Sequence, residues 1–117
     1  MNITGKQILI IDDDFMSEVI KNALISEGHD VRIAYTGHVG LAMFAQEPCD
    51  VVFVGHQLPD RPGSTVAKEI RERVRDQVVV MTVPSRPTQP LPDVSQVIVK
   101  PFTLEDFRDA VRDLDTR

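Results

Sequence analysis

The chain has 117 residues, enough for one domain with a hydrophobic core, and its 42% hydrophobic and 26% charged residues are typical of soluble globular proteins. Its net charge of −5, with basic residues scattered among acidic ones, argues against nucleic-acid binding, which depends on clustered lysine and arginine. No apolar stretch approaches the roughly 20 residues that cross a membrane, and the N-terminus lacks a signal-peptide pattern. Cys49 is the single cysteine, which fits a reducing compartment, so we expect a cytoplasmic protein without an internal disulfide.

The first predicted elements are a strand and a helix. Residues 7–11 contain the apolar run ILII, which predicts a buried strand that stops at three consecutive aspartates. A helix is predicted over residues 15–26 and ends at Gly28. Its inward-facing residues, at helical spacing, are Met16, Val19, Ile20, Ala23 and Leu24.

The middle of the chain repeats this alternation of strand and helix. Residues 31–35 predict a second strand, and a second helix runs from Thr36 or Gly37 to Pro48, with inward-facing Leu41, Phe44 and Ala45. The run VVFV at 51–54 is continuously apolar, as in a parallel strand buried on both faces. A third helix is predicted over 64–74, with these inward-facing residues: Val66, Ala67, Ile70 and Val74.

The last third of the chain interrupts the alternation. A fourth strand is predicted over 78–81, ending at Thr82, and a fifth over 96–99, ending at Lys100. Between them a regular helix would cost about 3 kcal/mol for each internal proline, and the prolines are Pro84, Pro87, Pro90 and Pro92. We therefore expect an extended or polyproline-like segment with at most one turn near 93–96. A capping-box-like TLED sequence starts the final helix at Thr103, with core residues Leu104, Phe107, Val111 and Leu114.

Alternating strands and helices predict an α/β fold with a parallel sheet covered on both faces. Right-handed crossovers and short connections leave few topologies, among them the flavodoxin-like order 2-1-3-4-5. We expect residues 1–117 to form a single domain with a doubly wound, five-stranded parallel sheet. The helix between the fourth and fifth strands is expected to be missing or degraded.

Polar residues gather where the predicted strands end, and ligands of open α/β sheets bind beyond the carboxyl ends of the strands. The residues at these ends are Asp12, Asp13, Gly55, Thr82 and Lys100. Two carboxylates about 4 Å apart repel each other by about 4 kcal/mol at an effective dielectric constant of about 20, so we expect a cation or the lysine ammonium beside them. The alternative is that Asp13 or Asp14 only caps the following helix.

Four motifs in order resemble the receiver domain of bacterial two-component response regulators, and the similarity covers nearly the whole chain. They are ILIIDDD (8–14), CDVVFVGHQLPDRPG (49–63), VVVMT (78–82) and VKPF (99–102). The resemblance implies that Asp12 and Asp13 match an acid pair that binds Mg²⁺. It also implies that Thr82 and Lys100 match groups that contact an aspartyl phosphate, and that a cis Lys100–Pro101 bond directs the lysine into the pocket.

Three departures from the family pattern change what the resemblance implies. Gly55 stands where the family has its phosphate-accepting Asp, so the nucleophile and one Mg²⁺ ligand are missing. We expect no catalytic residue and no cofactor, with at most weak Mg²⁺ binding at Asp12 and Asp13. Val97 stands where the family often has an aromatic switch residue. The span from the fourth strand to the lysine is also several residues shorter than usual.

These features predict a pseudo-receiver: a non-enzymatic, phosphorylation-independent module for protein interaction in a two-component-type pathway. It would homodimerise, or bind a protein partner or a fused output domain, through the last helix or residues 83–96, and it would bind neither nucleic acid nor membrane.

Two alternative functions stay open. One is a sensor that binds a small anion or metabolite beside Gly55, and the other is an active phosphoacceptor that uses His56, Asp12 or Asp13. A transition metal shared by His38, His56 and Asp13 is a further alternative to solvated loop histidines. His29 is expected on the surface at the opposite end of the sheet.

Overall fold

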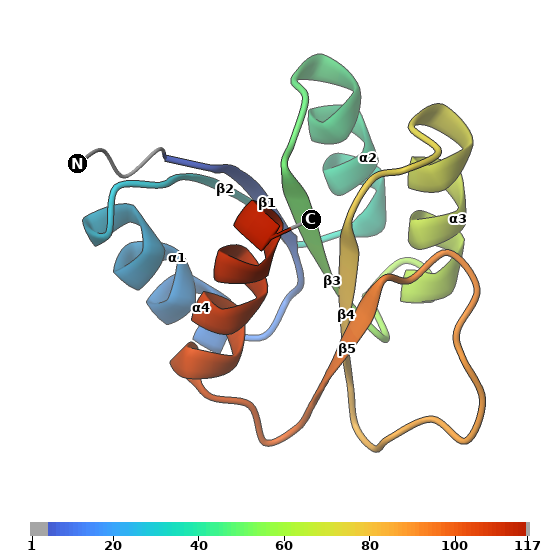
Figure 1. The fold of residues 1–117 in the computed structure, drawn as a ribbon. Helices are drawn as coiled ribbons and strands as arrows, with labels where there is room; N and C mark the ends of the chain where they lie inside the picture. Colours follow the sequence, from blue (N-terminus) through green and yellow to red (C-terminus); the bar gives the residue numbers. More distant parts are fainter. Residues whose placement is uncertain (1–4, 117) are drawn as a thin grey trace.

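Residues 5–116 are described by the structure, which is a computed structural model. Five parallel strands form one sheet in the order β2-β1-β3-β4-β5: β1 (Gln7–Ile11), β2 (Asp30–Ala34), β3 (Val51–Gly55), β4 (Val79–Val83) and β5 (Gln96–Val99). The helices are α1 (Met16–Ser26), α2 (Gly37–Gln46), α3 (Gly63–Arg73) and α4 (Leu104–Asp113), followed by the 3₁₀ turn η1 (Leu114–Thr116). The predicted flavodoxin-like, doubly wound fold is confirmed (Figure 1).

Helices cover both faces of the sheet because alternate residues of each strand point to opposite sides. One hydrophobic core joins Leu9, Ile11 and Val52 to α2 and α3, and the other joins Ile8, Ile10 and the buried faces of α1 and α4. Figure 1 shows these two helix pairs on opposite sides of the sheet. Since both faces are covered, the central strands β1, β3 and β4 are apolar at nearly every position, which is the pattern that identified them in the sequence.

The ends of several elements differ from the prediction by one or two residues. β4 begins one residue late and continues through Thr82 to Val83, because Val83 still pairs with Val99 in the ladder. β3 includes Gly55, which pairs with Thr82. Capping of the last helix by Thr103 is confirmed, since its hydroxyl accepts the Asp106 N–H and the Asp106 carboxylate accepts the Thr103 N–H.

Three predicted core positions were wrong: Val19, Ala45 and Val74 are exposed. Val74 follows the last turn of α3 with extended backbone, so its side chain leaves the helical stripe. Ala45 lies outside the buried stripe of α2, which consists of Gly37, Gly40, Leu41 and Phe44; Gly40 lies against Ile11, where a Cβ would collide with the isoleucine side chain. Val19 lies beside the α1 stripe that buries Ile20 and Leu24.

The predicted loss of a helix between β4 and β5 is confirmed: residues 84–95, called the proline segment below, form bends and one turn at residues 92–93. Arg71 fixes its end by donating from Nε to the Gln77 carbonyl (2.7 Å) and from Nη2 to the Ser95 hydroxyl oxygen (2.8 Å). Leu91 and Val94 of the segment are half-buried against the core. No helix within residues 5–116 is long and apolar enough to cross a membrane.

Candidate functional site

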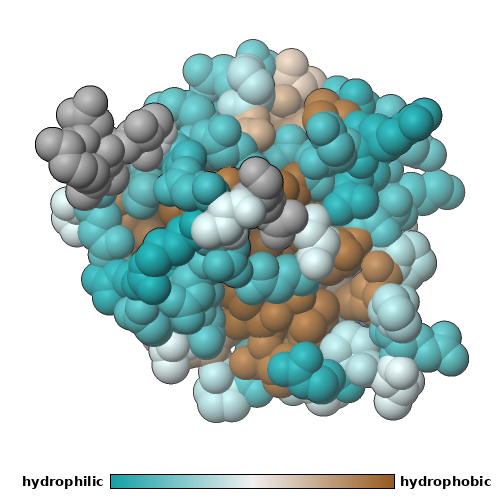
Figure 2. Space-filling view, in the orientation of Figure 1, coloured by the Kyte–Doolittle hydropathy of each residue, from teal (hydrophilic) through white to brown (hydrophobic). Residues whose placement is uncertain are grey.

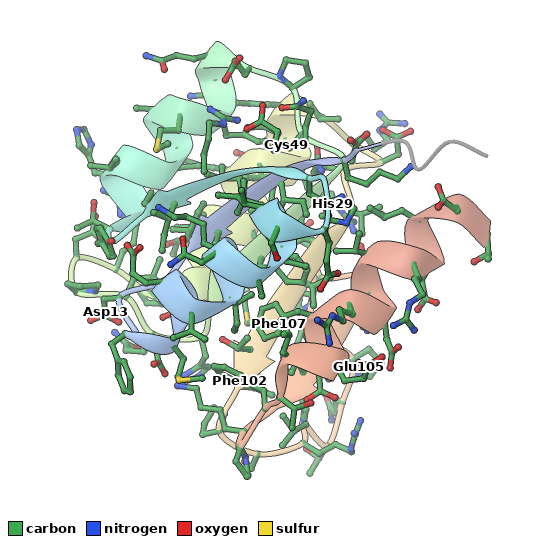
Figure 3. All side chains as sticks on the ribbon, turned by 90° about the vertical axis from the view of Figure 1, so that its left-hand side faces the viewer. Asp13, His29, Cys49, Phe102, Glu105 and Phe107 are labelled. Atoms are coloured by element: carbon green, nitrogen blue, oxygen red, sulfur yellow. The ribbon has the colours of Figure 1, made fainter. Side chains whose placement is uncertain are left out.

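The predicted site residues converge at the carboxyl ends of β1, β3, β4 and β5. They line one cavity of about 210 Å³, whose wall consists of Asp12, Asp13, Asp14, Gly55, His56, Gln57, Thr82, Pro84 and Lys100. Strand register explains this, because Ile11 pairs with Val54 and Gly55 pairs with Thr82. Figure 3 shows Asp13 at this end of the sheet and His29 and Cys49 toward the other.

Asp12 is the buried centre of the cavity wall, with 7% of its surface exposed. Its Oδ2 accepts the Thr82 hydroxyl at 3.4 Å, and its Oδ1 accepts the Asp14 N–H at 3.2 Å. A Cβ on Gly55 would lie 2.8 Å from Asp12 Oδ1 and 2.9 Å from its Cγ. The carboxylate of Asp12 therefore occupies the position that a side chain on residue 55 would need.

Burial raises the pKa of the Asp12 carboxyl above its ordinary value, because the ionised form loses its hydration. The N–H of Asp14 and the charge of Lys100 oppose this increase, while the neighbouring carboxylates of Asp14 and Asp13 add to it. Asp13 itself is exposed. The two adjacent acids are thus in different environments, and only one of them is a buried group.

Lys100 pairs with Asp14 rather than with the two predicted acids, at 3.6 Å between Nζ and Oδ2. The side chains are 45% and 26% exposed, so this ion pair contributes at most about 1 kcal/mol. Asp14 also accepts the Met16 N–H at 2.9 Å and so holds the first turn of α1. Asp14 therefore both caps the start of α1, as predicted, and takes part in the site. The Lys100–Pro101 peptide bond is cis.

A Mg²⁺ site needs several well-placed oxygen ligands, and at this cavity the carboxylates of Asp12, Asp13 and Asp14 would have to supply them. Both oxygens of Asp12 already accept hydrogen bonds, and Gly55 supplies no carboxylate. Nowhere in residues 5–116 do three or more His, Cys, Asp or Glu side chains come together as a metal cluster. The alternative of a metal shared by His38, His56 and Asp13 is therefore wrong, and both histidines are exposed.

The structure differs from the prediction for His29, which is less exposed than expected. His56 is exposed and is among the residues that line the cavity, while the direction of its side chain stays a prediction from strand alternation. His29 lies at the other end of the sheet, as predicted, but it is half-buried and its Nδ1 accepts the Lys6 N–H at 3.1 Å.

Asp60 was missed by the sequence analysis. Its carboxylate accepts the N–H groups of Gly37 (2.8 Å) and His38 (2.9 Å), so the β3–α3 loop caps the start of α2. The hydrogen bond from Gly37 is the largest cause of a lowered pKa for this carboxyl. Gly63 closes the same loop, where a Cβ would collide with the Gly55 carbonyl oxygen. An aspartate followed by Arg-Pro-Gly was the only signal in the sequence.

Val97 lies at the exposed edge of the sheet in β5. It is half-buried and packs on the core, as Leu91 and Val94 of the proline segment do. It lines two surface cavities, of about 290 Å³ beside the proline segment and about 330 Å³ toward α4. Figure 2 shows hydrophobic surface in brown close to β5 and the nearby end of α4. A valine there has no ring that could swing between two positions.

Comparison with solved structures supports the same fold. The chain is 26% identical to a CheY-like receiver domain protein from Methanospirillum hungatei, with a TM-score of 0.88 and coverage of 97% of this chain and 96% of that one. It is also 26% identical to TrrA of Thermotoga maritima, solved with Mg²⁺ and BeF, with a TM-score of 0.83 and coverage of 93% and 98%. In another structure TrrA is in complex with the histidine kinase ThkA; there the identity is 26%, the TM-score 0.82 and the coverage 93% and 97%.

The family pattern described as the response regulator receiver domain matches residues 8–112, which is most of the chain. This span includes the three aspartates after β1, the end of β3, Thr82 and Lys100. The chain therefore belongs to the family of response regulator receiver domains.

Proposed function

We propose that residues 1–117 form a single pseudo-receiver domain that acts in the cytoplasm by binding proteins, without being phosphorylated. Membership of the receiver family supports a role in two-component signalling. TrrA, a similar protein, was solved in complex with a histidine kinase, which supports a protein partner for this chain as well. The acidic net charge supports no role in nucleic-acid binding.

One observation carries the proposal: the end of β3 has no carboxylate, and Asp12 fills the space beside it. An aspartyl phosphate needs a carboxylate oxygen as its nucleophile. The remaining acids are poorly suited, because Asp12 is buried and hydrogen-bonded, while Asp13 and Asp14 lie on the turn outside the strand. Thr82 and Lys100 have structural contacts instead, with Asp12 and Asp14.

The proposed interaction surface is the edge of the molecule where a helix is missing. It consists of β5, the proline segment and the outer side of α4. The cavity beside the proline segment and the half-buried Val97 and Val99 leave apolar surface there, whereas the cavity toward α4 is mostly polar. A partner, a fused output domain or a second copy of the chain would cover it.

Amide chemical shifts during titration with Mg²⁺ and BeF₃⁻, which mimics a phosphoryl group on a carboxylate, test this proposal. We expect the signals of residues 12–14, 55–57 and 82–83 to stay unchanged in the wild-type chain. The Gly55→Asp variant provides the matched control, because it restores a third carboxylate. Saturable shifts of these signals in the wild type would contradict phosphorylation independence.

A second candidate function is the binding of a small ligand in the cavity of about 210 Å³. Three carboxyl groups and one ammonium group line it, so the surroundings favour a cationic or neutral metabolite over an anion. A thermal-shift screen tests this idea, since a ligand at 100 times its Kd stabilises the fold by about 2.7 kcal/mol. A hit whose effect persists in the Asp13→Asn and Lys100→Met variants would place the ligand elsewhere.

A further inference from the structure

Prolines recur with a period of three in the proline segment. Residues 84–92 read PSRPTQPLP, so Pro84, Pro87 and Pro90 are each three residues apart, whereas Pro92 is out of this register. A polyproline II helix has three residues per turn. In that conformation the three prolines of the series lie along one edge, and the fourth does not.

Proline also restrains most of this backbone. Each proline fixes its own φ near −65°, and the residue before it is biased to extended or polyproline II geometry. Within residues 84–92 this leaves only Ser85 and Thr88 without a restraint. The two bends of the segment, at residues 84–85 and 88–89, each contain one of these two residues. The bends therefore lie where proline places no restraint, and the restrained residues 86–87 and 90–91 lie outside them.

The fold presents this segment to solvent while holding its ends. Its exposed residues are Pro84, Ser85, Arg86, Thr88, Gln89, Pro90 and Pro92. On the N-terminal side β4 holds it through the ladder, and on the C-terminal side Ser95 donates its N–H to the Val79 carbonyl at 2.8 Å. Figure 1 shows the segment projecting beyond the sheet as a wide loop. A partner could therefore contact it without displacing a helix or strand.

Arg86 is the one charged residue within 84–92, and it is exposed. It does not take part in the ion pairs found among residues 5–116. A guanidinium group can stack on an aromatic ring or pair with a carboxylate of another molecule. The segment thus combines a proline edge with one exposed cation, which lies beside Asp106 and Asp109 in the cavity toward α4 but forms no ion pair with residues 5–116.

We propose that residues 84–92 are a polyproline ligand for a partner protein whose groove is lined with aromatic side chains and carries a carboxylate for Arg86. Aromatic-lined grooves recognise proline-rich segments because the polyproline II helix loses little entropy on binding. This inference names the class of partner for the interaction surface proposed above, and it rests on that proposed function. The opposing explanation is that the prolines only shape the connection from β4 to β5.

The experiment is a titration of the ¹⁵N-labelled chain with three purified proline-binding domains: an SH3, a WW and an EVH1 domain. Prolines lack an N–H, so the reporting amides are those of Ser85, Arg86, Thr88, Gln89 and Leu91. We expect saturable shifts of these amides with at least one domain. The double variant Pro87→Ala/Pro90→Ala is expected to weaken that binding by at least about tenfold.

Pro92→Ala is the matched control, because it removes a proline of the same segment that is out of register. It should change the affinity by less than about twofold, whereas Arg86→Glu should weaken binding and reduce its salt dependence. Urea midpoints of all variants must match the wild type, which separates loss of binding from unfolding.

Two results would overturn the inference: no saturable shift with any of the three domains at about 1 mM, or equal binding by the double variant and the wild type. Either result leaves the proposed function intact if the amide signals of the wild type also stay unchanged in the titration with BeF₃⁻. A response to BeF₃⁻ together with proline-dependent binding would refute phosphorylation independence and keep the polyproline ligand.

Discussion

Gly55→Ala is the substitution that most directly probes the contact between Asp12 and the end of β3. The added Cβ would lie 2.8 Å from Asp12 Oδ1 and 3.1 Å from Oδ2. These distances are shorter than an ordinary van der Waals contact, so the carboxylate must move by a few tenths of an ångström. Such a shift strains its hydrogen bonds to the Thr82 hydroxyl and the Asp14 N–H.

The expected magnitude follows from two opposing effects. Overpacking of a buried site costs about 1–3 kcal/mol. Replacing a strand glycine by alanine contributes about 0.5–1 kcal/mol in the other direction, because Gly55 is not among the residues of 5–116 with positive φ. We therefore expect Gly55→Ala to lower the free energy of unfolding by about 1–2 kcal/mol.

Urea unfolding of four proteins measures this interaction: the wild type, Gly55→Ala, Asp12→Ala and the double variant. Without the Asp12 carboxylate the three atoms nearest to the new Cβ are gone, so the same alanine should stabilise the protein by about 0.5–1 kcal/mol. The coupling energy should then be about 1.5–3 kcal/mol. Additive effects of the two substitutions would refute the conclusion that Asp12 occupies the space beside Gly55.

Three further predictions concern groups around the site. Asp12→Asn should stabilise the protein at pH 7. Burial raises the pKa of this carboxyl, so the difference in stability between the variant and the wild type should disappear as the pH falls through that raised pKa toward about 3.9, the ordinary value. Urea unfolding at several pH values measures this difference. Asp60→Asn should destabilise the start of α2 at pH 7. Because the pKa of Asp60 is lowered in the folded state, the wild type loses the stabilisation by this carboxylate as the pH falls through the folded-state pKa, and the variant and the wild type then become equal. Hydrogen exchange of the first turn of α2 measures this difference. Arg71→Ala should cost about 1–3 kcal/mol and accelerate amide exchange in the proline segment, because its hydrogen bonds to the Gln77 carbonyl and the Ser95 hydroxyl are lost.

The predictions for Asp12 and Arg71 each have a matched control. Asp13→Asn removes an exposed acid beside Asp12 and so controls for the loss of one negative charge. Arg75→Ala removes an exposed arginine near Arg71 and should leave the proline segment unchanged. A flat difference between the wild type and Asp12→Asn across the pH range would contradict the raised pKa. Equal exchange rates in Arg71→Ala and the wild type would show that other contacts hold the segment.

The fold was largely predictable because its strands are buried on both faces. A run such as VVFV at residues 51–54 has apolar side chains on both faces of the strand, as in the middle of a parallel sheet. Once five such runs alternate with helices, connection rules leave few strand orders, and the strand ends must meet. The convergence of Asp12, Thr82 and Lys100 follows from that geometry alone.

The details of the site were not predictable, because they depend on side-chain directions at a turn. Three consecutive aspartates point to different sides, so the sequence did not show that Lys100 pairs with Asp14. A glycine leaves space, but the sequence does not say whether a neighbouring side chain fills it, as Asp12 does. Capping of α2 by Asp60 joins residues far apart in the chain, and no local pattern reports such a contact.

Phosphorylation independence is the central claim, and intact mass spectrometry tests it most directly. Wild type and Gly55→Asp are incubated with acetyl phosphate and Mg²⁺, and the added mass is measured. In the variant, Asp12 must turn away from residue 55, and the restored carboxylate should then bind Mg²⁺ and gain one phosphoryl group. We predict that the wild type stays unmodified under the same conditions. A phosphoryl adduct on the wild type at high occupancy would contradict the account.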